Sequence, residues 1–175
     1  MIRVMALSMA LLLCFGCAGT EVDNSWEMTP NNAAAFAKYR EIIVDVQKRA
    51  DMHLGKNVCK RLNQRIEDCI ATEFPDRFLP VESKTALSRS LYLQVVITRY
   101  DNGSDFSTWS FQPPVNMLID CKVTVSDWQT KKKLAEFEVS KTYDRTNSKG
   151  RSISIGEFEH EFAQEVITAM TQQDH

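Results

Sequence analysis

Two apolar alternations on either side of a polar turn constrain the fold of this chain most. Residues 116–126 place Met117, Ile119, Cys121, Val123 and Val125 on one parity, and residues 134–143 do the same with Ala135, Phe137, Val139 and Tyr143. Because successive side chains of a strand point to opposite faces, each segment predicts a strand with one buried face. The polar turn at 127–132 joins them, so we expect an antiparallel hairpin with Cys121 in the core.

Three further segments predict strands of the same sheet. Residues 91–100 alternate with Leu91, Leu93, Val95 and Ile97 on one parity. The β-branched run at 40–46 is typical of a buried strand, and residues 78–81 could form a short one. Pro80 lacks an amide hydrogen, so it restricts that short strand to an edge or a strand end.

Two segments carry the helical period. Over residues 56–73 the apolar face is Val58, Cys59, Leu62, Ile66, Cys69 and Ile70. Over residues 155–171 it is Ile155, Phe158, Phe162, Val166, Ala169 and Met170. Each helix therefore has one face suited to packing on a sheet. Ser154 and Glu157 have the spacing of a capping box, which begins the second helix.

This order of elements predicts an α+β fold, with a mixed, mainly antiparallel sheet of four to five strands and two helices packed on one face. We place it in a single α+β domain over residues 38–175. The composition, 25% charged and 43% hydrophobic, suits one such domain. The formal net charge is −2, so the chain has no overall field that would attract nucleic acid, and we expect no nucleic-acid partner.

The amino-terminal segment has the layout of a signal peptide. Residues 1–16 hold one charge, Arg3, and an apolar run over residues 4–15. Twelve residues of helix span about 18 Å, whereas a bilayer core is about 30 Å thick, so the run is too short to cross a membrane. Residues 1–16 are therefore predicted to be a lipoprotein signal peptide that is removed.

The sequence Leu13-Cys-Phe-Gly-Cys-Ala18 resembles the lipobox of bacterial lipoproteins. The resemblance implies cleavage before Cys17 and a diacylglyceryl group on its sulfur, which would be the link to the membrane. Residues 17–37 then form a flexible, lipid-anchored tether. Ala18 after the lipidated residue implies the periplasmic face of the outer membrane. The alternative is cleavage after Ala18 by the ordinary secretory route, which leaves a soluble protein.

Three cysteines remain if Cys17 is lipidated. Cys59 and Cys69 lie about 15 Å apart along a helix, too far for a disulfide, which needs Cα atoms within about 7 Å. Cys121 could pair with either of them only if its strand packs under that helix. The other interpretation, which we favour, is that all three are small buried hydrophobic residues. No Cys or His spacing suggests zinc.

The second half of the chain resembles small Gram-negative envelope lipoproteins that contain a domain of unknown function. These are distantly similar to the amino-terminal domain of TolB and to the core of the curli-secretion lipoprotein. The resemblance rests on residues 91–100, on Leu134-Ala-Glu-Phe-Glu-Val139 and on the closing helix. It covers roughly the last half of the chain and implies a lipoprotein of the cell envelope.

Three large rings lie beside a Pro-Pro pair: Phe106, Trp109 and Phe111. Rings of this size are costly to leave in water, so they are candidates for contact with a partner. The simpler interpretation is that they cap one end of the sheet.

Two other patterns have ordinary explanations. Glu157 and His160 copy half of a di-iron ligand pair, but one motif of this kind is not enough, and His160 should face solvent. A group of basic residues is expected to lie in solvated turns, although these residues could also gather near anionic lipid headgroups. They are the lysines at 131–133, Lys141, Arg145, Lys149 and Arg151. We expect no metal, no cofactor and no catalytic residues.

The sequence thus leaves two functions open. The first is an outer-membrane-anchored periplasmic lipoprotein that acts as a non-catalytic accessory or assembly module and binds another envelope component, for which an envelope protein is one candidate. The second is a secreted, soluble protein that binds a small ligand or a peptide. No set of nucleophile, base and orienting group suggests an enzyme.

Overall fold

The computed structural model describes residues 36, 38–55, 57–83, 85–86, 89–102, 116–143 and 153–171. The strands are β1 (Glu41–Lys48), β2 (Leu79–Pro80), β3 (Ser90–Asp101), β4 (Met117–Asp127) and β5 (Lys133–Tyr143). The helices are α2 (Val58–Glu73) and α3 (Ile155–Thr171).

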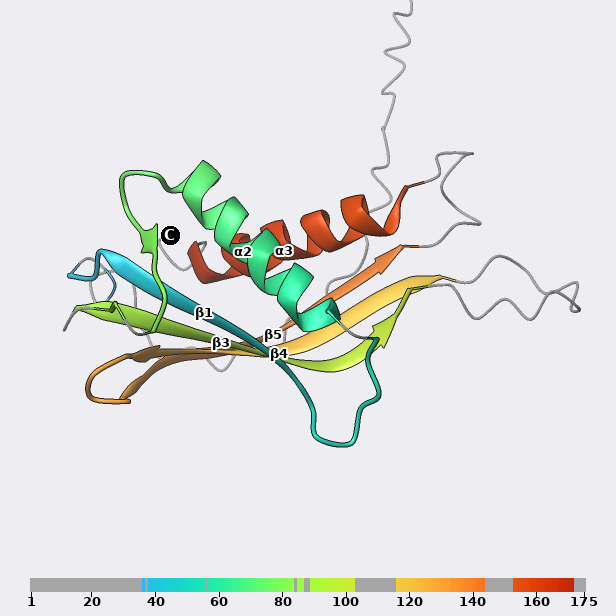
Figure 1. Ribbon diagram of the computed structural model, residues 1–175, viewed down its shortest axis with the longest axis horizontal. Coiled ribbons are helices and arrows are strands. Elements are labelled where there is room, and N and C mark those ends of the chain that lie inside the picture. Colours follow the sequence, from blue (N-terminus) through green and yellow to red (C-terminus); the bar gives the residue numbers. More distant parts are fainter. Residues whose placement is uncertain are drawn as a thin grey trace, which may run out of the picture.

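The strands form one mixed sheet in the order β2-β1-β3-β4-β5. Strand β1 runs parallel to both β2 and β3, whereas β3, β4 and β5 pair antiparallel. Figure 1 shows both helices on the same face of this sheet. The predicted α+β class, the hairpin and the two-helix layer are confirmed, and β2 is an edge strand, as Pro80 requires.

The core lies between the helices and the sheet. It is filled by the side chains of β3, β4 and β5 that the alternation predicts to be buried, together with Ile42, Val44 and Val46 of β1. The apolar faces of both helices complete it. Phe36 and Tyr39, ahead of β1, are also buried in it. The prediction that Ile155 belongs to the buried stripe of α3 is wrong, since this side chain is 36% exposed. Ile155 is the first residue of the helix, and the buried stripe begins at Phe158.

A bulge in β3 reverses the alternation at its end. The pairing with β4 shifts between Ile97 and Arg99, so Tyr100 comes to lie opposite Ile119. Without the shift, Tyr100 would share the outer face with Tyr92. An extra residue in one strand moves every later side chain to the other face. Tyr100 therefore points to the helix side, where it meets α3.

The helix α3 starts with the predicted capping box. The backbone N–H of Glu157 donates to Ser154 Oγ at 3.2 Å, and the Ser154 N–H donates to Glu157 Oε2 at 2.8 Å. The helix α2 starts differently, after Asn57 in the left-handed conformation with φ 78°. Its predicted start at residue 56 was two residues early.

The cysteines of the described residues are all free. Cys59 and Cys69 are not bonded, as predicted, and Cys121 is paired with neither. The expectation that all three are buried is confirmed for Cys69 and Cys121 but is wrong for Cys59, which is half-buried. Burial raises the pKa of Cys69 to about 11, so the thiol stays protonated at neutral pH.

None of the helices in the described part of the chain has both the length and the apolar character needed to cross a membrane.

Candidate functional site: a groove along the open edge of β1

Strand β1 has a partner on its outer side only at its start. The pairing with β2 covers Glu41 and Ile42, where the N–H of Leu79 donates to the carbonyl of Arg40 at 2.8 Å. The N–H of Val81 then donates to the carbonyl of Ile42 at 2.9 Å. Beyond Ile42 no described strand pairs with this side of β1, so its edge is open.

On this open side of β1, the backbone groups of every second residue point outward. The N–H of Val46 donates to the side-chain Oδ1 of Asn63 on α2 at 3.1 Å, in place of a strand. Between Ile42 and Val46, the alternation of a strand directs the N–H and C=O of Val44 to the same side. Val44 thus presents its backbone groups at the middle of the edge.

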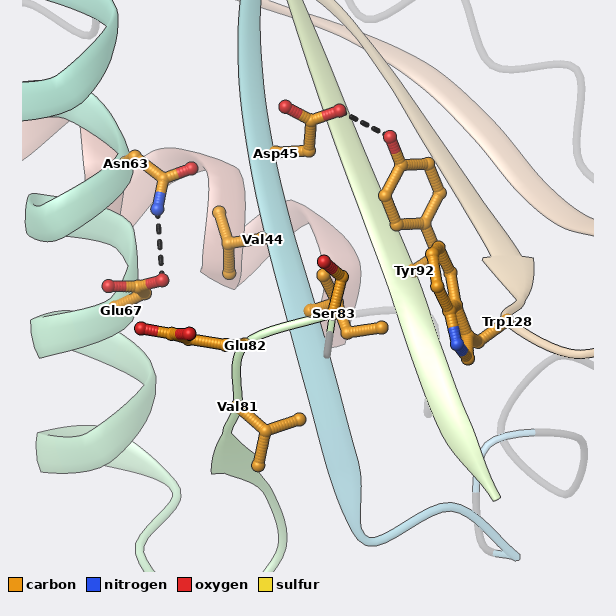
Figure 2. A pocket seen from close by; sticks show the side chains of 10 residues that line it. Val44, Asp45, Asn63, Glu67, Val81, Glu82, Ser83, Tyr92 and Trp128 are labelled. Atoms are coloured by element: carbon orange, nitrogen blue, oxygen red, sulfur yellow. Dashed lines mark hydrogen bonds between the residues drawn. The ribbon is translucent and has the colours of Figure 1, made fainter. Parts of the chain in front are cut away.

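A cleft of about 520 Å³ runs along this edge. We call it the β1 groove, and Figure 2 shows the side chains that line it. They come from β1, from α2, from the connection after β2, and from β3 and the β4–β5 turn: Ile43, Val44, Asp45, Asn63, Glu67, Val81, Glu82, Ser83, Tyr92 and Trp128. The groove therefore wraps around the strand edge and has a helix side and an outer side.

Carboxylates line the helix side of the groove. Glu67 of α2 accepts a hydrogen bond from Asn63 Nδ2 at 2.9 Å, and Figure 2 shows the carboxylate of Glu82 on the same side. Burial is the main reason that the pKa of Glu67 is raised, and the charges of Asp68 and Glu82 add to it. Within the described residues no Lys, Arg or His forms an ion pair with Glu67 or Glu82.

The outer side of the groove is aromatic. Tyr92 and Trp128 pack with ring centroids 5.4 Å apart, and Lys131 Nζ lies 3.3 Å from the centroid of the Trp128 ring. The Tyr92 hydroxyl donates to Asp45, which also accepts from Gln47 Nε2 at 2.6 Å. Burial and this carboxylate raise the pKa of Tyr92, so the hydroxyl remains a donor at neutral pH.

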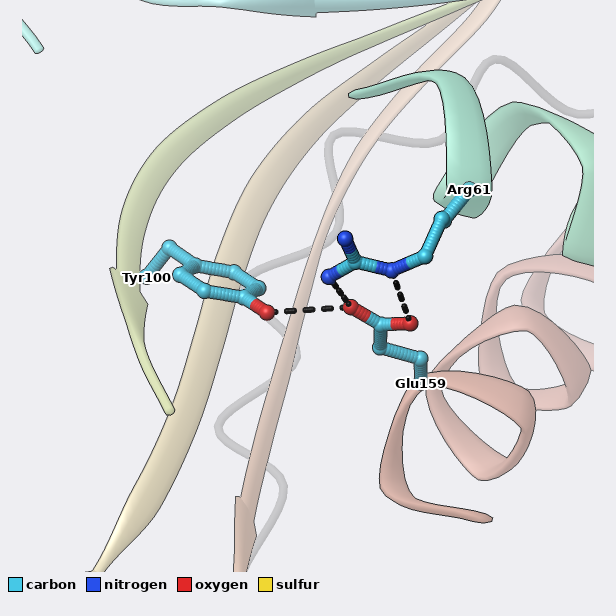
Figure 3. Close-up of polar contacts among 3 residues, drawn as sticks. All are labelled: Arg61, Tyr100 and Glu159. Carbon is cyan, nitrogen blue, oxygen red and sulfur yellow. Dashed lines mark hydrogen bonds and ion pairs between the residues drawn. The ribbon is translucent and has the colours of Figure 1, made fainter. Parts of the chain in front are cut away.

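A second polar cluster lies between the helices and the end of β3. Glu159 of α3 is 1% exposed, and Arg61 of α2 donates to both of its oxygens, from Nη2 at 2.7 Å and from Nε at 3.2 Å. Tyr100 donates to the same carboxylate at 3.0 Å, as Figure 3 shows. The bidentate pair joins α2 to α3, and the Tyr100 bond adds β3, so the cluster holds the layers together.

The carboxylate of Asp127 closes the β4–β5 turn. Asp127 Oδ1 accepts from the backbone N–H groups of Thr130 at 2.7 Å and Gln129 at 3.0 Å, and Oδ2 accepts from the Tyr39 hydroxyl at 2.7 Å. These donors lower the pKa of Asp127 to about 2. The contact fixes the segment before β1 to the turn.

The residues predicted as sites are not among those that the structure describes. Cys17 and the aromatic residues Phe106, Trp109 and Phe111 are outside the described residues. His160 is exposed, as predicted, and its Nδ1 lies 3.7 Å from Cys69 Sγ. In the described part of the chain no group of three or more His, Cys, Asp or Glu is placed to hold a metal ion.

The predicted basic residues that are described do not form one free patch. Lys141 pairs with Glu165 at 2.9 Å and with Glu161 at 3.5 Å, both on α3. Lys133 pairs with Glu136 at 3.2 Å, and Lys131 packs on Trp128. Arg145, Lys149 and Arg151 lie outside the described residues.

Sequence reasoning missed the groove. One signal was available: Asp45 interrupts the apolar run of β1, which a strand fully covered on both faces would not tolerate. The placing of Asn63 and Glu67 against that strand, however, depends on how α2 crosses the sheet, which no local pattern encodes.

Neither a protein-family model nor a curated protein matches the chain. Its fold is similar to that of a PelC dodecamer from Paraburkholderia phytofirmans, with a TM-score of 0.53 and 5% identity, over 85% of this chain and 95% of that one. It is also similar to the hypothetical protein CT253 from Chlamydia trachomatis, with a TM-score of 0.50 and 11% identity, over 75% and 95% of the two chains. At such identities the likeness concerns the fold alone.

Weaker likeness extends to a lipoprotein, GNA1162 from Neisseria meningitidis, with a TM-score of 0.44 and 12% identity over 77% of this chain and 96% of that one. A protein of the DUF330 family from Xanthomonas campestris is at a similar level, with a TM-score of 0.46. The structures similar to this chain thus include a domain of unknown function and a lipoprotein. The more specific expectation, a relation to TolB and the curli-secretion lipoprotein, is not shown by these comparisons.

Proposed function

We propose that this chain is a lipoprotein anchored to the periplasmic face of the outer membrane, whose α+β domain is a non-catalytic accessory or assembly module that binds another envelope component. The observation that carries the proposal is Cys17, which follows an apolar segment too short to span a bilayer. Two features support the binding role: the open β1 groove, and a fold shared with a protein that forms a dodecamer.

The lipid would dominate the membrane affinity. One myristoyl-sized chain binds a bilayer with a constant of about 10⁴ M⁻¹, which corresponds to about 5.5 kcal/mol, and each further buried CH₂ adds about 0.8 kcal/mol. A diacylglyceryl group on Cys17 has two acyl chains, so dissociation would be negligible. The residues after Cys17 then determine how far the domain stands from the bilayer.

The mass of the mature amino terminus tests the anchor. The full chain is produced in a Gram-negative host, and its amino-terminal peptide is analysed by mass spectrometry. We expect a diacylglyceryl group on Cys17, and retention of the protein in the membrane pellet after an alkaline carbonate wash. The Cys17→Ala variant should lose both, whereas Cys14→Ala, which changes a cysteine inside the predicted signal peptide, should lose neither.

An unmodified terminus at Gly19, with the protein released by the wash, contradicts the anchor. That result would favour the secreted, soluble binding protein, since cleavage after Ala18 produces that terminus.

A further inference from the structure

We propose that the β1 groove binds an extended, basic peptide segment of a partner protein, which adds to the sheet as a strand alongside β1. This inference rests on the proposed function, because it specifies how the domain binds its partner. Three features of the groove carry it: the backbone edge, the length of that edge and the charge of the helix side.

The backbone edge gives the mode of binding. A strand edge presents a row of N–H and C=O groups that another chain can pair with. Strand β2 pairs with the start of this row and leaves it after Ile42, while Asn63 receives the N–H of Val46 at the other end. An incoming segment placed in line with β2, beyond Ile42, would pair with the backbone of Val44. It would also replace Asn63 as the acceptor of the Val46 N–H.

The length of the edge limits the size of the segment. From Val44 to Lys48 the strand covers five residues, with no described strand on its outer side. At about 3.3 Å per residue, this stretch offers roughly 15 Å of edge once Asn63 is displaced from the N–H of Val46, which suits an added strand of four to five residues. The cleft along the edge leaves space for its side chains.

The charge of the groove gives the chemistry of the segment. Alternate side chains of an added strand would point to the helix side, toward Glu67 and Glu82, where no described cation is paired with them. Lys or Arg there would relieve the repulsion that contributes to the raised pKa of Glu67. On the outer side Asp45 already accepts from Tyr92 and Gln47, and Lys131 lies over Trp128, so aliphatic side chains suit the intervening positions.

The test measures binding of a fluorescein-labelled, blocked peptide of sequence Val-Lys-Val-Arg-Val-Lys-Val to the full chain purified in detergent, by fluorescence anisotropy. We expect saturable binding that weakens with salt. The peptide with Glu in place of Lys and Arg should not bind. In the complex, hydrogen exchange at the Val44 amide should slow, whereas amides of β5 should be unchanged.

Backbone methylation separates strand addition from simple charge attraction. N-methylation of alternate residues removes the donors on one edge of the peptide only. We expect one of the two methylated peptides to bind at least about ten-fold more weakly and the other to keep its affinity, because main-chain hydrogen bonds supply much of the affinity in this mode. Equal effects in both peptides would overturn the proposal.

Charge variants locate the site. The double variant Glu67→Gln and Glu82→Gln should bind the peptide about five-fold to ten-fold more weakly at low salt, since an exposed ion pair contributes up to about 1 kcal/mol. Glu138→Gln is the matched control, because this exposed carboxylate lies on β5 at the opposite edge of the sheet. Circular dichroism checks that each variant is folded. Unchanged affinity in the double variant would place the binding elsewhere.

The two proposals fail separately. If Cys17 carries lipid and the basic peptide does not bind, the groove proposal falls while the anchor stands. If the peptide binds in the groove of a chain without lipid, the anchor falls while the groove proposal stands.

Discussion

Two glutamates on the helix side of the sheet differ in how their charge is satisfied. Glu159 is almost fully buried, yet it receives three hydrogen bonds, two from Arg61 and one from Tyr100. Glu67 is only half-buried, but it receives one amide hydrogen bond and faces the like charge of Glu82. The more buried charge is the better compensated.

This difference separates a structural contact from a surface available to a ligand. A buried carboxylate with a bidentate arginine and a tyrosine has little capacity left for another donor. A carboxylate in an open groove with one weak partner can still accept charged donors from outside. The cluster of Arg61, Tyr100 and Glu159 therefore serves stability, whereas Glu67 is free to take the recognition role proposed for the β1 groove.

The largest expected effect comes from breaking the compensated cluster. Arg61→Ala leaves the Glu159 carboxylate buried without its cation, and we expect it to lower the free energy of unfolding by about 3 kcal/mol. Equilibrium urea denaturation at pH 7 measures this loss. Tyr100→Phe, which removes a single hydrogen bond, should cost about 1 kcal/mol.

The double variant Arg61→Met and Glu159→Leu sharpens that test. It removes both charges and fills the space with apolar side chains, so it should recover most of the stability lost in Arg61→Ala. A loss of less than about 1 kcal/mol in Arg61→Ala would mean that Glu159 does not depend on this pair.

The strands and helices were predictable because their signals are local. The parity of Met117 to Val125 and the helical stripe from Phe158 to Met170 repeat within a single element, and burial follows that repeat. The edge position of β2 was predictable because Pro80 lacks a backbone donor. These features fix the layers without any knowledge of distant contacts.

The polar clusters were not predictable for the opposite reason. Glu159 was not singled out, because its partners lie 98 and 59 residues away in sequence. Tyr100 reaches it only through the β-bulge after Ile97, which moves the ring to the helix side. The β1 groove likewise exists because β2 pairs with only two residues of β1, and nothing in either segment encodes that length.

Asp127, like Glu159, is a carboxylate whose charge is satisfied by several donors, and it offers a second test with a smaller expected effect. Its pKa of about 2 lies below the ordinary value of 3.8, so the contact stabilises the fold above pH 4, and this contribution is lost as the pH falls from about 4 to 2. We expect Asp127→Asn to lower the free energy of unfolding by about 1 to 2 kcal/mol at pH 7. Urea denaturation at pH 7 and pH 2.5 should show that difference shrink. A constant difference would mean that the charge of Asp127 is not what holds the turn.

The smallest effect is expected at Glu67. It tests most directly whether a carboxylate of the β1 groove keeps an uncompensated charge. Its pKa is raised in the folded state, so the folded protein binds a proton there more tightly than the unfolded chain does. The ionised carboxylate therefore opposes folding at pH 7, and this opposition fades as the pH falls through the folded pKa.

The isosteric change Glu67→Gln removes the charge and keeps an oxygen that can accept from Asn63. It should raise the free energy of unfolding at pH 7 by less than about 1 kcal/mol, and the gain should disappear toward pH 4. Glu82→Gln is the control, with a smaller gain, because it removes the neighbouring charge from an exposed position. If Glu67→Gln instead destabilises the protein at pH 7, then Glu67 is compensated in the folded state as Glu159 is, and the helix side of the groove has no free charge to offer a partner.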